Sequence, residues 1–89
     1  MSRSRNIKPA IMDNEDLADL EPLTRLLFIY LWMLADREGR LEDRPKRIAA
    51  QALPYDRTAD VDAMLNGLKN AGFIDRYEVG GVACIQVIN

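Results

Sequence analysis

The sequence predicts an α+β fold, with about four helices followed by a C-terminal β-hairpin. Three observations predict it. An apolar segment with helical periodicity runs from Pro22 to Asp36, an amphipathic segment runs from Thr58 to Ala71, and two segments rich in β-branched residues flank Gly80-Gly81. Apolar residues spaced three and four apart indicate helices, whereas such segments around a Gly-Gly loop indicate paired strands. The helices therefore come first and the strands last.

Length and composition indicate one small domain. The chain has 89 residues, of which 48% are hydrophobic, enough for a single modest core. We expect residues 1–12, which carry Arg3, Arg5 and Lys8 and no acid, to form a basic arm or a short strand, and residues 13–89 to form the domain. A single cysteine fits a reducing cytoplasm. The longest apolar run, ten residues from Leu26 to Ala35, is half of the roughly 20 that a membrane span needs. We therefore expect a cytoplasmic protein that does not enter a membrane.

The first half of the domain is predicted to be helical. Pro9 limits any helix in the arm. Asn14 is placed to cap a short helix whose first turn carries acids, which the helix dipole favours. The helix from Pro22 to Asp36 is apolar nearly all round, and such a helix is normally surrounded by other elements. We therefore expect Phe28 and Trp32 in the interior.

The second half of the domain begins with a charged turn around Gly39, after which we expect a short strand at Leu41. A helix then runs from Pro45 to Pro54, and Thr58 caps the helix that reaches Ala71. Gly67 costs this last helix about 1 kcal/mol relative to Ala. We expect a close contact with a neighbouring element to be the reason for a glycine there.

The two strands, Phe73 to Val79 and Val82 to Ile88, are joined by a two-residue Gly-Gly loop, which predicts a type I′ hairpin. With Val79 opposite Val82, the register pairs Ile74 with Val87, Arg76 with Ile85 and Tyr77 with Cys84. The residues expected to contact the helices are Ile74, Ile85 and Val87, and those expected to face outward are Asp75, Tyr77 and Gln86. A helix that ends at a glycine and continues directly into a hairpin is typical of a winged helix-turn-helix. This is the fold that the sequence predicts, with the hairpin as its wing.

The chain offers few residues for catalysis or metal binding. It has no histidine, which removes the commonest general base and metal ligand. Its one cysteine, Cys84, has no histidine to activate it, and no glycine-rich loop can hold a phosphate. The acids at Asp13, Glu15, Asp16 and Asp19 lack the glycine and the terminal glutamate of a calcium loop. We expect no enzyme, no metal and no cofactor.

Basic residues favour nucleic-acid binding. Residues 44–57 carry four bases, Arg44, Lys46, Arg47 and Arg57, against one acid. In a helix-turn-helix such positions commonly lie near the DNA phosphates. Contacts of lysine and arginine with phosphates set the affinity and the register of the protein on DNA. The candidate DNA-binding residues are Arg44, Lys46, Arg47, Arg57, Asn66, Lys69 and Arg76. The alternating charges from Arg37 to Arg44 leave a self-paired, solvated surface as the other interpretation of the bases.

Two acids at the start of the last helix oppose strong binding. Asp60 and Asp62 lie at the helix end that would enter a groove, where they would repel phosphates. They also fit a plain helix N-terminus, where negative charge complements the dipole. We therefore expect a monomer to bind DNA weakly, and an acidic face of this kind also suits a basic protein partner.

Four blocks occur in order along the chain: Asn6–Pro9, Leu23–Phe28, Ala35–Leu41 and Ala71–Val79. In these blocks the chain resembles the N-terminal winged-helix domain of bacteriophage and prophage replication-initiation proteins, over almost its whole length. The resemblance implies recognition of an origin or a single strand, and recruitment of a host helicase or its loader through a further C-terminal region. The chain departs from that family at residues 10–12, where Ala-Ile-Met replaces the usual Glu-Phe-Trp.

The sequence thus predicts a non-catalytic DNA-binding protein of a phage or prophage, acting in replication initiation or transcriptional control. The alternative is a protein–protein interaction module that docks a host replication factor or associates with a second copy of itself as a homodimer. The residues do not decide between these two functions.

Overall fold

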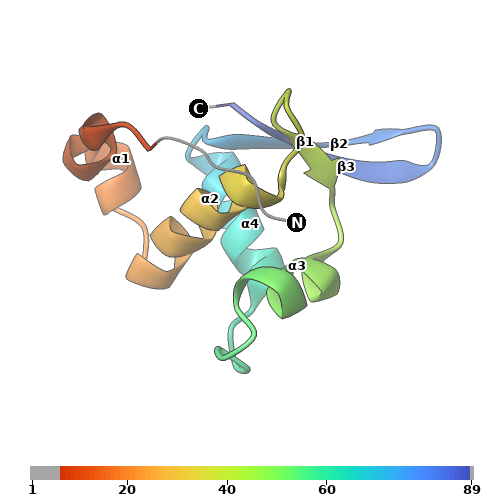
Figure 1. The fold of residues 1–89 in the computed structure, drawn as a ribbon, viewed down its shortest axis with the longest axis horizontal. Helices are drawn as coiled ribbons and strands as arrows, with labels where there is room; N and C mark the ends of the chain where they lie inside the picture. The colour runs from red at the N-terminus through yellow and green to blue at the C-terminus, as the bar shows by residue number, and fades with distance from the viewer. Residues whose placement is uncertain (1–6, 89) are drawn as a thin grey trace.

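The computed structural model describes residues 7–88, in which the helices lie on one side of a small antiparallel sheet (Figure 1). In chain order the elements are a 3-10 helix η1 (Pro9–Asp13), α1 (Glu15–Ala18), α2 (Pro22–Leu34), β1 (Arg40–Glu42), α3 (Pro45–Ala52), α4 (Val61–Asn70), β2 (Ile74–Val79) and β3 (Val82–Val87). The α+β fold class is confirmed, and the arrangement is compatible with a winged helix.

The sheet has the strand order β1-β3-β2, so the second strand of the hairpin lies in the middle. The predicted hairpin register is confirmed, with Val79 opposite Val82 and every other pair as expected. Gly80 and Gly81 have φ of 57° and 82°, the positive values that a type I′ turn requires. The short strand expected at Leu41 is also confirmed, and Leu41 pairs with Ile85.

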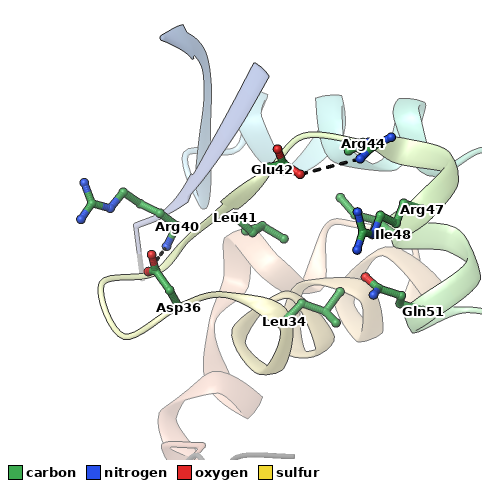
Figure 2. A pocket seen from close by; sticks show the side chains of 9 residues that line it. All are labelled: Leu34, Asp36, Arg40, Leu41, Glu42, Arg44, Arg47, Ile48 and Gln51. Atoms are coloured by element: carbon green, nitrogen blue, oxygen red, sulfur yellow. Dashed lines mark hydrogen bonds and ion pairs between the residues drawn. The ribbon is translucent and has the colours of Figure 1, made fainter. Parts of the chain in front are cut away.

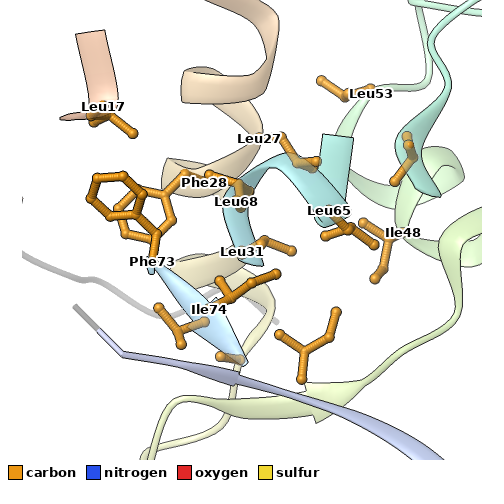
Figure 3. Packing of buried hydrophobic residues seen from close by; sticks show 14 residues of the cluster. Leu17, Leu27, Phe28, Leu31, Ile48, Leu53, Leu65, Leu68, Phe73 and Ile74 are labelled. Carbon is orange, nitrogen blue, oxygen red and sulfur yellow. The ribbon is translucent and has the colours of Figure 1, made fainter. Parts of the chain in front are cut away.

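The core lies between α2, α4 and the inner face of the sheet (Figure 3). Its fully buried residues, each 0% exposed, are Leu27, Leu31, Ala35, Leu65, Leu68 and Ile85. The helical members are three or four positions apart, which puts them on one face of each helix. At one end of the core Phe28 packs against Phe73, with 5.1 Å between ring centroids, and Leu17 of α1 lies beside them. The expected burial of Ile74, Ile85 and Val87 is confirmed.

Helix α2 is shorter and more exposed than predicted. It ends at Leu34, not at Asp36, because Ala35 is already extended with ψ of 157°. The Asp36 carboxylate accepts hydrogen bonds from the backbone N–H groups of Glu38 and Arg40, both at 2.9 Å, and thereby favours a turn over further helix. The expectation that other elements surround α2 was wrong. Met33 is 50% exposed and Trp32 is only half-buried, whereas Phe28 is interior as predicted.

Helix α4 begins later than predicted, at Val61 instead of Thr58. The cap is Asp60, whose carboxylate accepts a hydrogen bond from the backbone N–H of Ala63 at 3.1 Å. Asp is at least as good a cap as Thr, and Thr58 lies in the exposed turn before it. The helix also ends one residue before the predicted Ala71.

The N-terminal part differs from its prediction as well. The proposed arm or strand covered residues 1–12, of which residues 1–6 lie outside the described part. Pro9 to Asp13 form a short 3-10 helix and no strand, because a proline is well tolerated in the first turn of a helix. The predicted cap at Asn14 is confirmed, since its side chain accepts from the backbone N–H of Leu17 at 3.0 Å. No helix within residues 7–88 has the length and apolar character needed to cross a membrane.

Two glycines respond oppositely to a methyl group. A Cβ at Gly67 meets nothing within 4 Å, so the expected close contact is absent there. A Cβ at Gly39, where φ is +79°, would lie 3.1 Å from the backbone oxygen of Val87.

We predict that Gly67→Ala raises the free energy of unfolding by about 0.5–1 kcal/mol. Gly39→Ala should lower it by about 1–3 kcal/mol. Urea unfolding of both variants checks this, and a Gly67→Ala protein less stable than the wild type would contradict it.

Candidate nucleic-acid interface

Arg76 of β2 occupies the space between the hairpin and α4. Its guanidinium binds the carboxylate of Asp43 twice, from Nε to Oδ2 at 2.6 Å and from Nη2 to Oδ1 at 2.8 Å. It also donates to Oδ1 of Asp62 at 2.8 Å and to Oδ1 of Asn66 at 2.9 Å. Asp62 and Asn66 are four residues apart and therefore lie on one face of α4. We call these four residues the Arg76 cluster.

The two carboxylates of the Arg76 cluster differ in burial. The side chain of Asp43 is 7% exposed, whereas that of Asp62 is 59% exposed. Solvent screens the Asp62 pair and leaves the Asp43 pair as the main tie. The hydrogen bond to Asp43 raises the pKa of Arg76 above its ordinary value, although burial opposes the shift. A raised pKa means that this stabilisation is present in full below the ordinary arginine pKa, so Arg76 stays charged at neutral pH.

The Arg76 cluster uses every donor that Arg76 has. A guanidinium carries five N–H groups. Four of them serve the bonds already described, and the fifth contact runs from Nη1 to the backbone oxygen of Asp62 at 3.4 Å. All the donors of Arg76 therefore have partners in the structure, and its assignment as a DNA contact stays a prediction. Asn66 accepts from the same arginine through its Oδ1, whereas the two N–H groups of its Nδ2 are not part of the cluster.

The sequence contained a signal for this arrangement. The predicted register placed Arg76 opposite Ile85, and Ile85 was expected to contact the helices. Residues directly opposite each other in a sheet point to the same face. Arg76 therefore had to point toward the helices. Asp43 and Asp62, the two acids that receive it, were not among the predicted site residues.

Three predicted cations are exposed at α3, α4 and the turn between them. Lys46 lies in the first turn of α3, Arg57 in the turn before α4, and Lys69 in the last turn of α4. None of the three forms an ion pair with another residue in the range 7–88. Long side chains with an unpaired charge are the groups that contact phosphates.

Arg44 and Arg47 belong to a different surface. They line a groove of about 300 Å³ between the end of α2, β1 and α3, together with Leu34, Leu41 and Ile48 (Figure 2). Lys46 does not line this groove. Successive residues of an α-helix are rotated by about 100° around its axis, so two residues span about 200°. Lys46 and Ile48 therefore point to nearly opposite sides of α3. The basic segment is therefore divided between two faces.

The acids of α4 are less available than the sequence indicated. Asp60 caps the helix through its carboxylate, and Asp62 is paired with Arg76. The Arg76 cluster still carries one net negative charge, because two aspartates face one arginine. The space between α4 and the hairpin is thus filled with paired groups and slightly acidic.

Residues 7–88 contain no cluster of three His, Cys, Asp or Glu side chains that could hold a metal ion. Cys84 is half-buried in β3, and its sulfur lies 3.5 Å from the backbone oxygen of Val82. Comparison of the chain with protein-family models, with curated proteins and with solved structures gives no significant match. The site is therefore interpreted from its own geometry.

Loss of Arg76 should destabilise the fold. Arg76→Leu leaves the buried carboxylate of Asp43 without its cation, and an uncompensated charge of this kind costs about 2–4 kcal/mol. Urea unfolding at neutral pH measures the change. Arg37→Leu, at an exposed turn position, is the matched control and should change stability by less than about 0.5 kcal/mol. Equal stabilities for the two variants would show that the cluster does not hold the hairpin.

Proposed function

We propose that this chain is a winged-helix domain that binds DNA without catalysis, in the replication initiation or transcriptional control of a phage or prophage. The observation that carries the proposal is the arrangement of α3, α4 and the hairpin. The order β1, α3, α4, β2, β3 with a β1-β3-β2 sheet is compatible with a winged helix, in which α4 would take the place of the groove-facing helix. The phage context rests on the four resembling sequence blocks alone.

Phosphate contacts supply the binding in this proposal. Lys46, Arg57 and Lys69 are exposed around α4 and have no partner in the described range that would have to be displaced. Such contacts give affinity that is independent of sequence and falls with salt. Base readout is weak, because Arg76 is fully used and Asn66 is held by it. The expected mode is therefore weak binding of the monomer that follows the DNA backbone.

The double variant Lys46→Glu/Arg57→Glu tests this mode. Reversing two phosphate-contacting cations should lower the affinity for DNA by at least about tenfold and reduce the steepness of its salt dependence by about two counterions. Fluorescence anisotropy with duplex and single-stranded DNA at two salt concentrations measures both effects. Arg37→Glu, which reverses an exposed charge in the turn before β1, is the control.

Binding that does not depend on salt contradicts the proposal, and so does the absence of binding by the wild type at tens of micromolar protein. The loss of DNA affinity per reversed charge is compared between the double variant and Arg37→Glu. Equal losses per charge would mean that DNA affinity depends on the net charge of the protein and not on the positions of Lys46 and Arg57. A preference for single-stranded over duplex DNA would favour an origin-opening role within the same proposal.

A second candidate function is docking of a protein, such as a host replication factor with a basic surface. The net negative charge of the Arg76 cluster, next to Asp60, specifically favours it. Under this view the α4 face receives lysines or arginines of a partner and DNA is not the ligand.

Asp60→Asn discriminates between the two functions. Asn is as good a helix cap as Asp, so the variant removes a charge and keeps α4 intact. Removing repulsion of phosphates should raise the affinity for DNA about two- to fivefold. Under the docking view, affinity for a basic protein would fall instead. Anisotropy with DNA, at one low salt concentration, decides the sign, and a lower DNA affinity than that of the wild type argues against the leading proposal.

A further inference from the structure

The groove between α2, β1 and α3 has an apolar floor and a basic side. Leu34, Leu41 and Ile48 form the floor, and Arg47 and Gln51 of α3 stand beside it (Figure 2). Its volume of about 300 Å³ is enough to receive one or two side chains of a partner. The groove is thus suited to an apolar side chain with a negatively charged neighbour.

The charges around the groove are mostly paired with one another. Glu42 lies 3.8 Å from Arg44, Arg40 pairs with Glu38, and the Asp36 carboxylate accepts two backbone N–H groups. Arg47 has no carboxylate within ion-pair distance among the described residues. Among the bases that line the groove, Arg47 is therefore the one whose charge is not paired by a carboxylate of the described residues.

The complementary surface is at the other end of the same molecule. Met12, in η1, is 79% exposed, the most exposed methionine of the described residues. The acids Asp13, Glu15, Asp16, Asp19 and Glu21 follow it, and no base occurs from Pro9 to Thr24. An apolar side chain followed by a series of acids matches a groove with an apolar floor and a free arginine. In Figure 1 this segment lies at one extremity of the molecule, with α2 between it and α3. Helix α1 packs against α2, and no residue of this segment lines the groove.

We propose that two copies of this chain associate head to tail, with Met12 of one copy in the Leu34–Leu41–Ile48 groove of the next. The acids that follow Met12 then lie near Arg47 of the receiving copy. The two surfaces are different, so the contact is heterologous and each copy keeps one free end, from which further copies can add. A contact of this size is weak and is weakened further by salt.

This association does not require DNA. It depends on Arg47, whereas the proposed DNA binding depends on Lys46. It goes beyond the proposed function and can be true if that function is wrong. Measured on protein alone, it cannot be confused with a change in DNA affinity.

Sedimentation velocity over a range of protein concentrations, at low and high salt, tests the association. The average mass of the wild type should rise as the protein concentration is raised to hundreds of micromolar. In high salt it should fall back toward the mass of the monomer. Met12→Lys removes the inserted side chain and Arg47→Glu reverses the groove charge, so each variant alone should remain monomeric. Met33→Lys, at another exposed methionine outside both surfaces, is the control and should behave as the wild type.

Mixing the two monomeric variants is the decisive experiment. Met12→Lys retains a working groove and Arg47→Glu retains a working acidic end, so an equimolar mixture should form dimers that do not grow further. Circular dichroism and urea unfolding verify that both variants are folded. A wild type that is monomeric at every concentration overturns the proposal, and so does a mixture that stays monomeric or a symmetric dimer that neither substitution disrupts.

Discussion

The bond between Arg76 and Asp43 is the constraint on which the position of the hairpin depends. On the inner face of the hairpin the buried residues Ile74, Val87 and Ile85 come first, Arg76 lies opposite Ile85, and the next pair outward, Glu78 and Ala83, is exposed. At this level the hairpin is held by the bonds of Arg76 and by backbone pairing with β1, which includes the N–H of Asp43 donating to the backbone oxygen of Ala83 at 2.9 Å. Because Arg76 bonds Asp43 and α4 at once, it fixes the hairpin relative to both. A buried pair of this kind specifies a geometry more than it adds stability, since desolvation offsets much of its attraction.

This constraint also determines which groups remain for a ligand. The surface between α4 and the hairpin would be the natural place for a nucleic acid, yet its arginine and its asparagine are bonded to each other. What remains are Lys46, Arg57 and Lys69 on the periphery, whose exposed charges are suited to phosphate contacts. Under the proposed function, the same residues that fix the hairpin would therefore lower the capacity for sequence recognition. Specificity, if the domain binds DNA, has to come from DNA structure or from assembly.

The fold was predictable from the sequence where local chemistry alone decides it. The Gly-Gly loop determined the hairpin register. The side chain of Asn14 caps the N-terminus of α1, as predicted. The starts and ends of helices were less predictable, because Thr58 and Asp60 are both good caps and only the path of the chain decides between them. Most of the site residues were predicted from the positive charge of their side chains. The sequence does not show whether such a charge is already paired with an acid in the folded protein. Arg76 and Lys46 look equivalent in the sequence, but only tertiary contacts with Asp43 and Asp62 distinguish them.

The division of the bases on α3 connects the two proposals. Lys46 and Arg47 are neighbours in sequence but point to different sides of the helix, one away from the groove and one beside it. One copy can therefore bind a phosphate through Lys46 while its groove receives the next copy. Each added copy brings its own phosphate contacts to the same DNA, so the second binding event is intramolecular and gains from effective concentration. If both proposals hold, weak phosphate contacts and weak contacts between copies would reinforce each other along an extended DNA site.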